Sequence, residues 1–341
     1  MKIVFFGTPQ FAVPSLKSLL THSDFDVLAV VTQPDKRRGR GGKVTPSPVK
    51  VVALEAGCPI WQPPRIKKDA DTLQKLNALA ADAFVVIAYG QILSQEILDM
   101  PQLGCVNAHG SILPAYRGAA PIQWCLHDGA TTTGVTTMLM DAGMDTGPML
   151  MKETIPIGLT DNAWTVAEKL SELSAALLTT TLQKLYQQNI RPIPQDDERA
   201  TYASLIKKED YCLDWRQSAK AIHDKARGFY PNCTTEFREK PLKISATLPL
   251  ETTYLEEVSQ QPSSDVTSLI NLYADADISP NQPPGTIVTI LKNYGPVVQT
   301  GSGHLLLQEV KPAGKRALSG WDFANGSRLT VGARLGSAMS Q

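Results

Sequence analysis

Hydrophobic and polar positions in the first half of the chain follow two alternating periodicities. Short apolar runs rich in β-branched residues predict strands, and apolar residues spaced three and four apart predict helices. The predicted strands are residues 2–6, 26–32, 83–88, 105–107 and 134–140. The predicted helices are residues 10–20, 47–56, 69–80, 118–127 and 162–188. Strands that alternate with helices in this way are typical of a doubly wound α/β domain with a mostly parallel sheet.

One of these runs, residues 83–88, is apolar at every position, which predicts a strand buried on both faces. In open α/β sheets, ligands bind beyond the carboxyl ends of the strands. Asn107 and His109 are predicted to lie just past one strand end, and Asp145 in the loop after another. We therefore expect a functional site at this edge of the sheet.

The second half of the chain has a different pattern. Residues 189–198 are polar and contain two prolines, which is typical of a linker. A helix is then predicted at residues 218–228. Short strands separated by glycine, proline and polar turns are predicted at residues 242–246, 285–291, 297–300 and 305–309. Because 341 residues can bury two cores, we predict a catalytic domain at 1–188, a linker at 189–206 and a smaller OB-like β-barrel domain at 207–341.

Charge is balanced over the whole chain but segregated along it. The 33 basic and 33 acidic residues give a net charge of zero, so global charge indicates neither a nucleic-acid binder nor a membrane-surface protein. Between residues 36 and 43, however, five of eight residues are Lys or Arg and the others are Gly. Residues 251–284 contain no Lys or Arg, and the polar tract 259–284 is predicted to be a loose insertion. After residue 285 the balance turns basic again, so one face can still suit a polyanion.

The cysteine pattern and the apolar runs indicate the compartment. The five cysteines are scattered without a C-x-x-C pair, which argues for a reducing compartment and against a disulfide frame or a zinc site. The first apolar segment is too short for a signal peptide, and no run approaches the roughly 20 residues of a membrane span. We expect a cytoplasmic protein that uses neither a membrane nor a metal.

Three polar residues suit one kind of chemistry. Asn107 and His109 are two apart in an extended segment and so share a side, and Asp145 follows in a separate loop. An amide and a protonated imidazole can hold the oxyanion of a tetrahedral intermediate, while a carboxylate tunes the imidazole for proton transfer. Alone, His109 could be an exposed loop residue and Asp145 a turn former. Together the three residues favour transfer of an acyl-type carbon between nitrogens.

The basic segment at 36–43 has two open interpretations. Its cations are Lys36, Arg37, Arg38, Arg40 and Lys43. The segment is not a P-loop, because that motif would need Gly at position 37 and Ser or Thr at position 44. It is either a solvated, mobile loop or a flexible arm that grips a phosphate backbone.

With these residues in view, the chain resembles the methionyl-tRNA formyltransferases over nearly its whole length. The matching motifs are FGTP at 6–9, TQPD at 32–35, PSPVK at 46–50, AYG at 88–90, NAHGSILP at 107–114, RGAAPIQ at 117–123, MDAGMDTG at 140–147 and KPAGK at 311–315. The N-x-H-G-S and D-T-G motifs are shared by folate-dependent formyltransferases of this fold. The basic segment, PSPVK and the late PAGK are particular to the tRNA enzymes.

The resemblance implies both substrates and the residues that bind them. The donor is 10-formyltetrahydrofolate, and the acceptor is the α-amino group of methionine esterified to initiator tRNA. Asn107 and His109 hold the oxyanion, and Asp145 pairs with His109. The folate lies along Ser111, Ile112, Leu113 and Pro114, with its pterin at the backbone near Gln91 and Leu93. The segment around Arg40 grips the tRNA, as does an OB-like second domain, and the protein is a monomer without a protein partner.

Three other functions stay open. A sugar-nucleotide N-formyltransferase shares the catalytic residues but would lack the Arg-rich segment and the basic C-terminal barrel. In a formyltetrahydrofolate hydrolase, water replaces the amine. A non-catalytic RNA-binding protein on this scaffold would not need Asn107, His109 and Asp145 intact.

Overall fold

The computed structural model describes residues 1–38, 42–259 and 266–336. The chain divides by its contacts into two compact units, which we call the N-terminal and C-terminal units. The N-terminal unit is Met1–Pro121, Thr132–Ile155 and Ala167–Ser204. The C-terminal unit is Ile122–Thr131, Pro156–Val166 and Leu205–Gln341.

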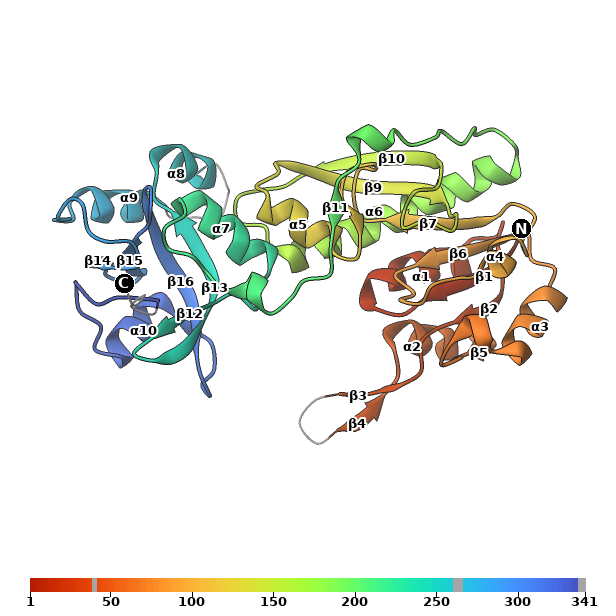
Figure 1. The fold of residues 1–341 in the computed structure, drawn as a ribbon, viewed down its shortest axis with the longest axis horizontal. Helices are drawn as coiled ribbons and strands as arrows, with labels where there is room; N and C mark the ends of the chain where they lie inside the picture. Colours follow the sequence, from red (N-terminus) through yellow and green to blue (C-terminus); the bar gives the residue numbers. More distant parts are fainter. Residues whose placement is uncertain (39–41, 260–265, 337–341) are drawn as a thin grey trace. The chain divides into compact units, whose positions relative to one another are not determined.

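The N-terminal unit is built on a seven-stranded sheet of order β10-β9-β7-β6-β1-β2-β5 (Figure 1). The strands are β1 Lys2–Gly7, β2 Asp26–Val31, β5 Ile60–Trp61, β6 Ala83–Ile87, β7 Cys105–His109, β9 Thr132–Leu139 and β10 Met149–Pro156. The pairs β1/β2, β1/β6, β6/β7 and β2/β5 are parallel, and β7/β9 is antiparallel. The predicted α/β fold with a mostly parallel sheet is confirmed.

Helices connect these strands close to their predicted positions. They are η1 Gln10–Ala12, α1 Val13–Thr21, α2 Pro48–Glu55, η2 Ile66–Lys68, α3 Ala70–Ala78, α4 Gln95–Leu98, α6 Ala163–Tyr186 and η3 Asp197–Arg199. Ser47 begins α2 by accepting a hydrogen bond from the backbone N–H of Lys50, and Asp69 begins α3 by accepting one from Thr72. Such side-chain caps satisfy backbone donors that have no partner inside the helix.

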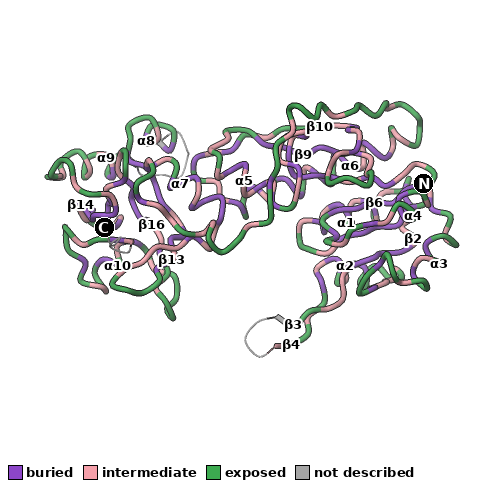
Figure 2. The backbone as a smooth tube through the Cα atoms, in the orientation of Figure 1, coloured by how far each residue is buried: buried purple, intermediate pink, exposed green. Residues whose placement is uncertain are grey.

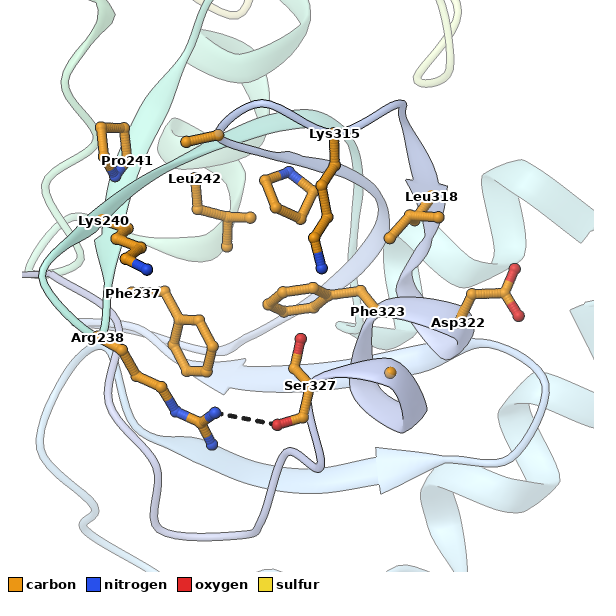
Figure 3. Close-up of a pocket in the computed structure, with 13 residues that line it drawn as sticks. Phe237, Arg238, Lys240, Pro241, Leu242, Lys315, Leu318, Asp322, Phe323 and Ser327 are labelled. Carbon is orange, nitrogen blue, oxygen red and sulfur yellow. Dashed lines mark hydrogen bonds between the residues drawn. The ribbon is translucent and has the colours of Figure 1, made fainter.

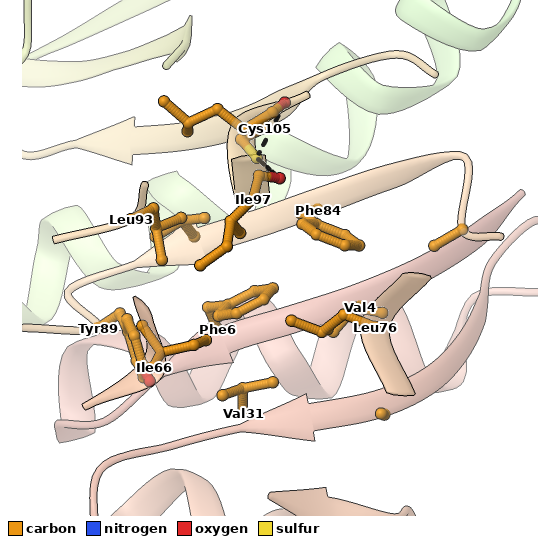
Figure 4. Close-up of a cluster of buried hydrophobic side chains, with 14 residues drawn as sticks. Val4, Phe6, Val31, Ile66, Leu76, Phe84, Tyr89, Leu93, Ile97 and Cys105 are labelled. Atoms are coloured by element: carbon orange, nitrogen blue, oxygen red, sulfur yellow. Dashed lines mark hydrogen bonds between the residues drawn. The ribbon is translucent and has the colours of Figure 1, made fainter. Parts of the chain in front are cut away.

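The central strands carry the core of this unit. Every residue of β6 is buried, as its uniformly apolar sequence predicts (Figure 2). Phe6 of β1 packs against Phe84 of β6 and against Tyr89, with ring centroids 5.3 and 5.5 Å apart (Figure 4). These aromatic contacts fix the rigid sheet from which the neighbouring strand β7 presents its side chains.

Strand β7 extends further than predicted. Asn107 and His109 lie inside the strand, so their placement just past its end is wrong. The extension arises from β9, whose antiparallel register pairs Asn107 with Met138 and His109 with Thr136. The predicted helix at 118–127 is shortened instead, because β8 Arg117–Gly118 pairs with β11 Tyr202–Ala203 and α5 begins only at Pro121.

The described residues of the basic segment pair as a two-stranded hairpin, which neither of its two interpretations specified. Strand β3 Lys36–Arg38 pairs with β4 Lys43–Thr45, and this ribbon extends away from the sheet (Figure 1). Lys36 pairs with Thr45, Arg37 with Val44, and Arg38 with Lys43. The predicted contact residue Arg40 lies outside the described residues.

The C-terminal unit contains an antiparallel sheet of order β12-β13-β16-β15-β14, with β17 paired to β16. Its strands are β12 Thr234–Phe237, β13 Lys240–Pro249, β14 Ile287–Leu291, β15 Gly295–Gln299, β16 His304–Pro312 and β17 Leu318–Ser319. Its helices are α5 Pro121–His127, η4 Glu209–Tyr211, α7 Ala219–Gly228, α8 Thr252–Ser259, α9 Val266–Ala274 and α10 Gly320–Gly326. The separate β unit is confirmed, and its OB-like topology stays a prediction.

The described part of the acidic tract, which is the polar segment 259–284 of the sequence, contains a helix. Helix α9 lies inside the supposed loose insertion, and α8 comes just before it. Their apolar residues Leu255, Val258, Val266 and Leu269 are buried against Val288 and its neighbours in the sheet. The prediction of a loose insertion is therefore wrong for α9. In α8 the side chains of Glu256 and Glu257 are exposed, while apolar residues at helical spacing enter the core.

A buried polar group joins helix α7 to its surroundings in the C-terminal unit. His223 contacts the Thr247 hydroxyl through Nδ1 and the Leu159 carbonyl through Nε2, each at 2.9 Å. Burial lowers the pKa of His223 from 6.5 to about 4, against the opposing effect of the Leu159 hydrogen bond. The imidazole is therefore neutral at physiological pH.

Candidate active site

Strand β7 presents Asn107 and His109 on one side of the sheet, because side chains two apart in a strand share a face. His109 is buried, with 7% of the residue's surface exposed. Asn107 is half-buried, and within the described residues its Oδ1 atom is buried without a hydrogen-bond partner. A buried acceptor left unpaired is costly in an ordinary core and is typical of a site that awaits a ligand.

The His109 ring lies between two oxygens. Its Nε2 lies 2.9 Å from the Tyr116 carbonyl, and its Nδ1 lies 3.6 Å from Asp145 Oδ2. A carbonyl only accepts, so the Nε2 atom carries a hydrogen. Asp145 Oδ2 therefore lies at ion-pair distance from the other ring nitrogen, on the side away from the Tyr116 carbonyl.

The Asp145 carboxylate is oriented by backbone contacts. Its Oδ2 accepts a 2.8 Å hydrogen bond from the backbone N–H of Gly118. Asp145 adopts a left-handed backbone conformation with φ 56°, which is uncommon for a residue other than glycine. The turn therefore points this carboxylate at His109. The tertiary structure brings Asp145 beside β7, as the sequence predicts.

A further set of residues stands behind this turn. Gln195 Nε2 donates to the carbonyls of Asp145 and Gly147, both at 2.7 Å. Its Oε1 accepts from Arg117 Nε at 3.0 Å, and Arg117 in turn pairs with Asp197 at 2.7 Å. Sequence reasoning missed Gln195, because it lies in a polar segment without a motif. Arg117 is identified from the sequence only as part of the RGAAPIQ motif.

Gly118 occupies a position that no other residue fits well. Its φ is 120°, and a Cβ there would lie 2.6 Å from the Ala203 carbonyl oxygen. Glycine thus lets β8 approach β11 while its N–H reaches the carboxylate of Asp145.

The predicted folate segment is held by a buried threonine of β9. Thr136 Oγ1 accepts from the Leu113 backbone N–H at 3.0 Å and donates to the Ser111 carbonyl at 2.8 Å. The Ser111 hydroxyl donates to the Ala115 carbonyl, and Lys152 Nζ donates to the Leu113 carbonyl. Ile112 and Pro114 belong to the same short segment, directly after His109. The structure thus fixes the segment beside the β7 site.

The two predicted pterin neighbours use their side chains inside the protein. Gln91 accepts from the Ile66 N–H at 2.8 Å and donates to the Pro63 carbonyl at 3.0 Å. Leu93 is buried in the core beside Ile97. A role in ligand binding would therefore fall to the backbone of this segment.

The base of the basic hairpin is tied to that same segment. Lys36 Nζ donates to Gln33 Oε1 at 2.8 Å, and Gln33 Nε2 donates to the carbonyls of Tyr89 and Gly90 at 3.0 Å. Nearby, hydrogen bonds from Lys50 lower the pKa of the Asp35 carboxyl. The hairpin therefore starts from a fixed base on the sheet.

The C-terminal unit contains a separate pocket of about 290 Å³ (Figure 3). Phe237 and Phe323 lie in it at a centroid distance of 5.4 Å, and Arg238, Lys240 and Lys315 contribute cationic side chains. Arg238 donates to the Ser327 carbonyl at 3.1 Å. Lys315 comes from the predicted PAGK motif.

The described residues contain neither a group suited to bind a metal ion nor a helix suited to span a membrane. No cluster of three or more His, Cys, Asp or Glu residues there could hold a metal ion. Among the same residues, none of the helices is long and apolar enough to cross a membrane.

Family sequence models identify the class of protein to which the chain belongs. The sequence model of the formyl transferase family matches residues 1–182, and the model of the formyl transferase C-terminal domain matches residues 205–328. Together with the fold and the β7 site, these matches define a formyl transferase.

Full-length relatives narrow the class to one family. Methionyl-tRNA formyltransferase of Trichormus variabilis is 63% identical over 336 residues, covering 98% of this chain and 99% of the relative. The enzyme of the same name from Synechocystis sp. is 54% identical, covering 97% and 99%. The chain belongs to the methionyl-tRNA formyltransferase family. It is thus an enzyme, as the sequence predicted.

Solved structures agree in fold. WlaRD, a sugar 3N-formyl transferase crystallised with dTDP and 5-N-formyl-THF, has a TM-score of 0.61 at 17% identity, covering 93% of this chain and 99% of WlaRD. HypX from Aquifex aeolicus, in complex with tetrahydrofolic acid, has a TM-score of 0.59 at 14% identity. This match covers 97% of the chain but only 48% of HypX, so the chain spans about half of that protein. At these identities the likeness concerns the fold alone.

Proposed function

We propose that this enzyme transfers the formyl group of 10-formyltetrahydrofolate to the α-amino group of methionine on initiator tRNA. The observation that carries the proposal is that His109, on the same face of β7 as Asn107, lies 3.6 Å from Asp145, in a chain of this family. The relatives' names supply the acceptor, and a folate derivative is bound in two structures of the same fold.

The reaction needs positioning and charge stabilisation more than activation of the amine. An α-amino group has a pKa near 8, and the adjacent ester lowers it further, so a useful fraction is free base at neutral pH. Its nitrogen attacks the formyl carbon to give a tetrahedral intermediate with an oxyanion. The bond from that carbon to N10 of the folate then breaks, and the proton lost by the amine ends on N10.

The site residues divide this work between them. Asn107 and protonated His109 donate to the oxyanion, and Asp145 stabilises the imidazolium and aids the proton transfer. Both ring nitrogens of His109 already face protein oxygens, Tyr116 O and Asp145 Oδ2. One N–H of His109 must therefore exchange its protein acceptor for the substrate oxygen when the donor binds.

The folate and the tRNA are assigned to different surfaces. The folate lies along Ser111, Ile112, Leu113 and Pro114, with its pterin against the backbone at Gln91 and Leu93, and no metal takes part. The tRNA is gripped by the basic hairpin, through Lys36, Arg37, Arg38, Arg40 and Lys43. This assignment treats residues 1–188 as catalytic and 207–341 as an OB-like tRNA-binding domain. Residues 189–206 link the two and, through Gln195, also contact the Asp145 turn. The enzyme acts as a monomer in the cytoplasm.

The test is an acceptor comparison with the purified enzyme. Formyl incorporation from 10-formyltetrahydrofolate is measured with methionyl initiator tRNA, with a UDP-amino sugar and with no acceptor. We expect incorporation on the tRNA only. Transfer to the sugar would replace the acceptor, and release of formate without an acceptor would indicate a hydrolase. Absence of all three reactions would leave a non-catalytic RNA-binding protein.

A further inference from the structure

We propose that Gln195, anchored by Arg117, is a positioning residue that holds the Asp145 turn in its reactive conformation. The inference rests on the function proposed above, because it concerns the geometry of that site. Gln195 lies outside the strands, and its hydrogen bonds go to Arg117, Asp145 and Gly147 and not to residues of β7.

A single amide nitrogen clamps both ends of the turn. The two hydrogens of Gln195 Nε2 go to the carbonyls of Asp145 and Gly147, each at 2.7 Å. The orientation of this amide follows from chemistry. Arg117 can only donate, so Oε1 must face its guanidinium and the NH₂ group must face the two carbonyls.

The turn needs such a clamp because its backbone is unfavourable. A left-handed conformation is unfavourable for a non-glycine residue, so it persists only where neighbouring contacts fix it. At Asp145 this conformation, with φ 56°, directs Oδ2 to the Gly118 N–H and to within 3.6 Å of His109 Nδ1. Without the clamp, the residue can relax to a negative φ, which turns the carboxylate away from His109.

Arg117 and the residue after it support the Asp145 turn through two different contacts. Its side chain is buried, with the residue only 1% exposed, and its Nε holds Gln195 at 3.0 Å. The next residue, Gly118, donates its N–H to the carboxylate of Asp145. The Arg117–Gly118 strand therefore contacts the carboxylate directly and fixes the backbone of the same turn through Gln195.

Two substitutions separate the hydrogen bonds that Gln195 donates to the turn from the one that it accepts from Arg117. Gln195→Glu keeps an oxygen for Arg117 but loses both donors to the turn, whereas Gln195→Met loses both functions at similar length. Single-turnover formyl transfer to methionyl initiator tRNA is measured with both substrates saturating, and KM values are measured by steady-state titration of each substrate. We expect both variants to be about 10- to 100-fold slower, with KM values changed less than about threefold, because small misplacement of a reactive group has effects of this size.

Two further variants provide the controls. Asp197→Asn alters the far end of the Arg117 contact, where the Asp197 side chain is 81% exposed, and is expected to transfer at the wild-type rate within about twofold. Asp145→Asn keeps an oxygen for the Gly118 N–H but removes the charge. Adding Gln195→Glu to Asp145→Asn is expected to slow transfer by less than about twofold further, because both changes disable one group.

Each alternative outcome has a distinct meaning. Wild-type speed for Gln195→Glu, with slow Gln195→Met, would show that the side chain only anchors Arg117 and overturn the inference. Equal slowing of the wild type and Asp145→Asn by Gln195→Glu, or slowing that merely follows a lower melting temperature, would overturn it too. Wild-type speed for Asp145→Asn itself would instead refute the proposed role of Asp145, on which the inference depends.

Discussion

Thr136 offers a sharp test of how the site is built, because it is the buried hydroxyl that holds the proposed folate segment. Thr136→Val is nearly isosteric and suits a strand equally well. The change removes the acceptor of the Leu113 N–H and the donor to the Ser111 carbonyl. Thr136 is 0% exposed, so water cannot replace the lost contacts without opening the structure.

The expected loss follows from those two groups. Leaving a buried donor or acceptor unpaired costs about 1–3 kcal/mol, and the carbonyl is the cheaper of the two. We therefore expect Thr136→Val to lower the free energy of unfolding by about 2–4 kcal/mol. The matched control is Thr133→Val on the same strand. The Thr133 hydroxyl is buried without a partner within the described part of the chain, so its removal should leave stability unchanged or raise it by up to about 1 kcal/mol.

The assay combines stability with local opening and function. Urea unfolding of both variants gives the free-energy difference, and hydrogen exchange at the Leu113 amide reports the local contact. The KM for 10-formyltetrahydrofolate should rise in Thr136→Val and stay unchanged in Thr133→Val. Equal destabilisation by the two substitutions, or an unchanged exchange rate at Leu113, would refute this account of the segment.

The remaining predictions concern catalysis, tRNA binding and pH. His109→Ala should reduce transfer by about 100-fold or more while tRNA affinity, measured by filter binding, stays nearly constant; a large loss of affinity would contradict its catalytic assignment. Arg40→Ala should weaken tRNA binding and reduce the slope of log affinity against log salt by about one; an unchanged slope would remove Arg40 from the interface. The pKa of His223 is about 4 in the folded state, whereas the ordinary value of 6.5 applies in the unfolded chain. Between these pH values the unfolded chain therefore binds one proton more than the folded chain. The free energy of unfolding should accordingly fall by about 3 kcal/mol as the pH drops from 6.5 to 4. Urea unfolding at pH 7 and 4.5 measures this loss, which His223→Gln should diminish; the same pH dependence in both proteins would exclude His223 as its source.

Local sequence predicts most of the elements because their signals are local. The apolar run of β6, the Ser47 cap of α2 and the Asp69 cap of α3 each act within a few residues. The wrong predictions of secondary structure occur where contacts with distant segments determine the local structure. Strand β7 reaches His109 because β9 pairs with it, and α9 forms inside the acidic tract because Val266 and Leu269 are buried against the sheet.

The candidate site likewise contains residues that the sequence identifies and contacts that it does not. Asn107, His109 and Asp145 could be named from the sequence, because their chemical types and the family motifs identify them. Their partners could not be named. Tyr116 contacts His109 through its backbone carbonyl, and Gly118 contacts Asp145 through its N–H, and every residue except proline offers both groups.

The sequence by itself determined the periodicity of the elements, the chemical groups available for formyl transfer and the family to which the chain belongs. Only the tertiary structure decided how these groups are aimed. The left-handed turn at Asp145, the Gln195 clamp and the buried Arg117 join residues about fifty to eighty positions apart. Such contacts arise when packing closes long loops, and a residue's own neighbours in sequence carry little information about that closure.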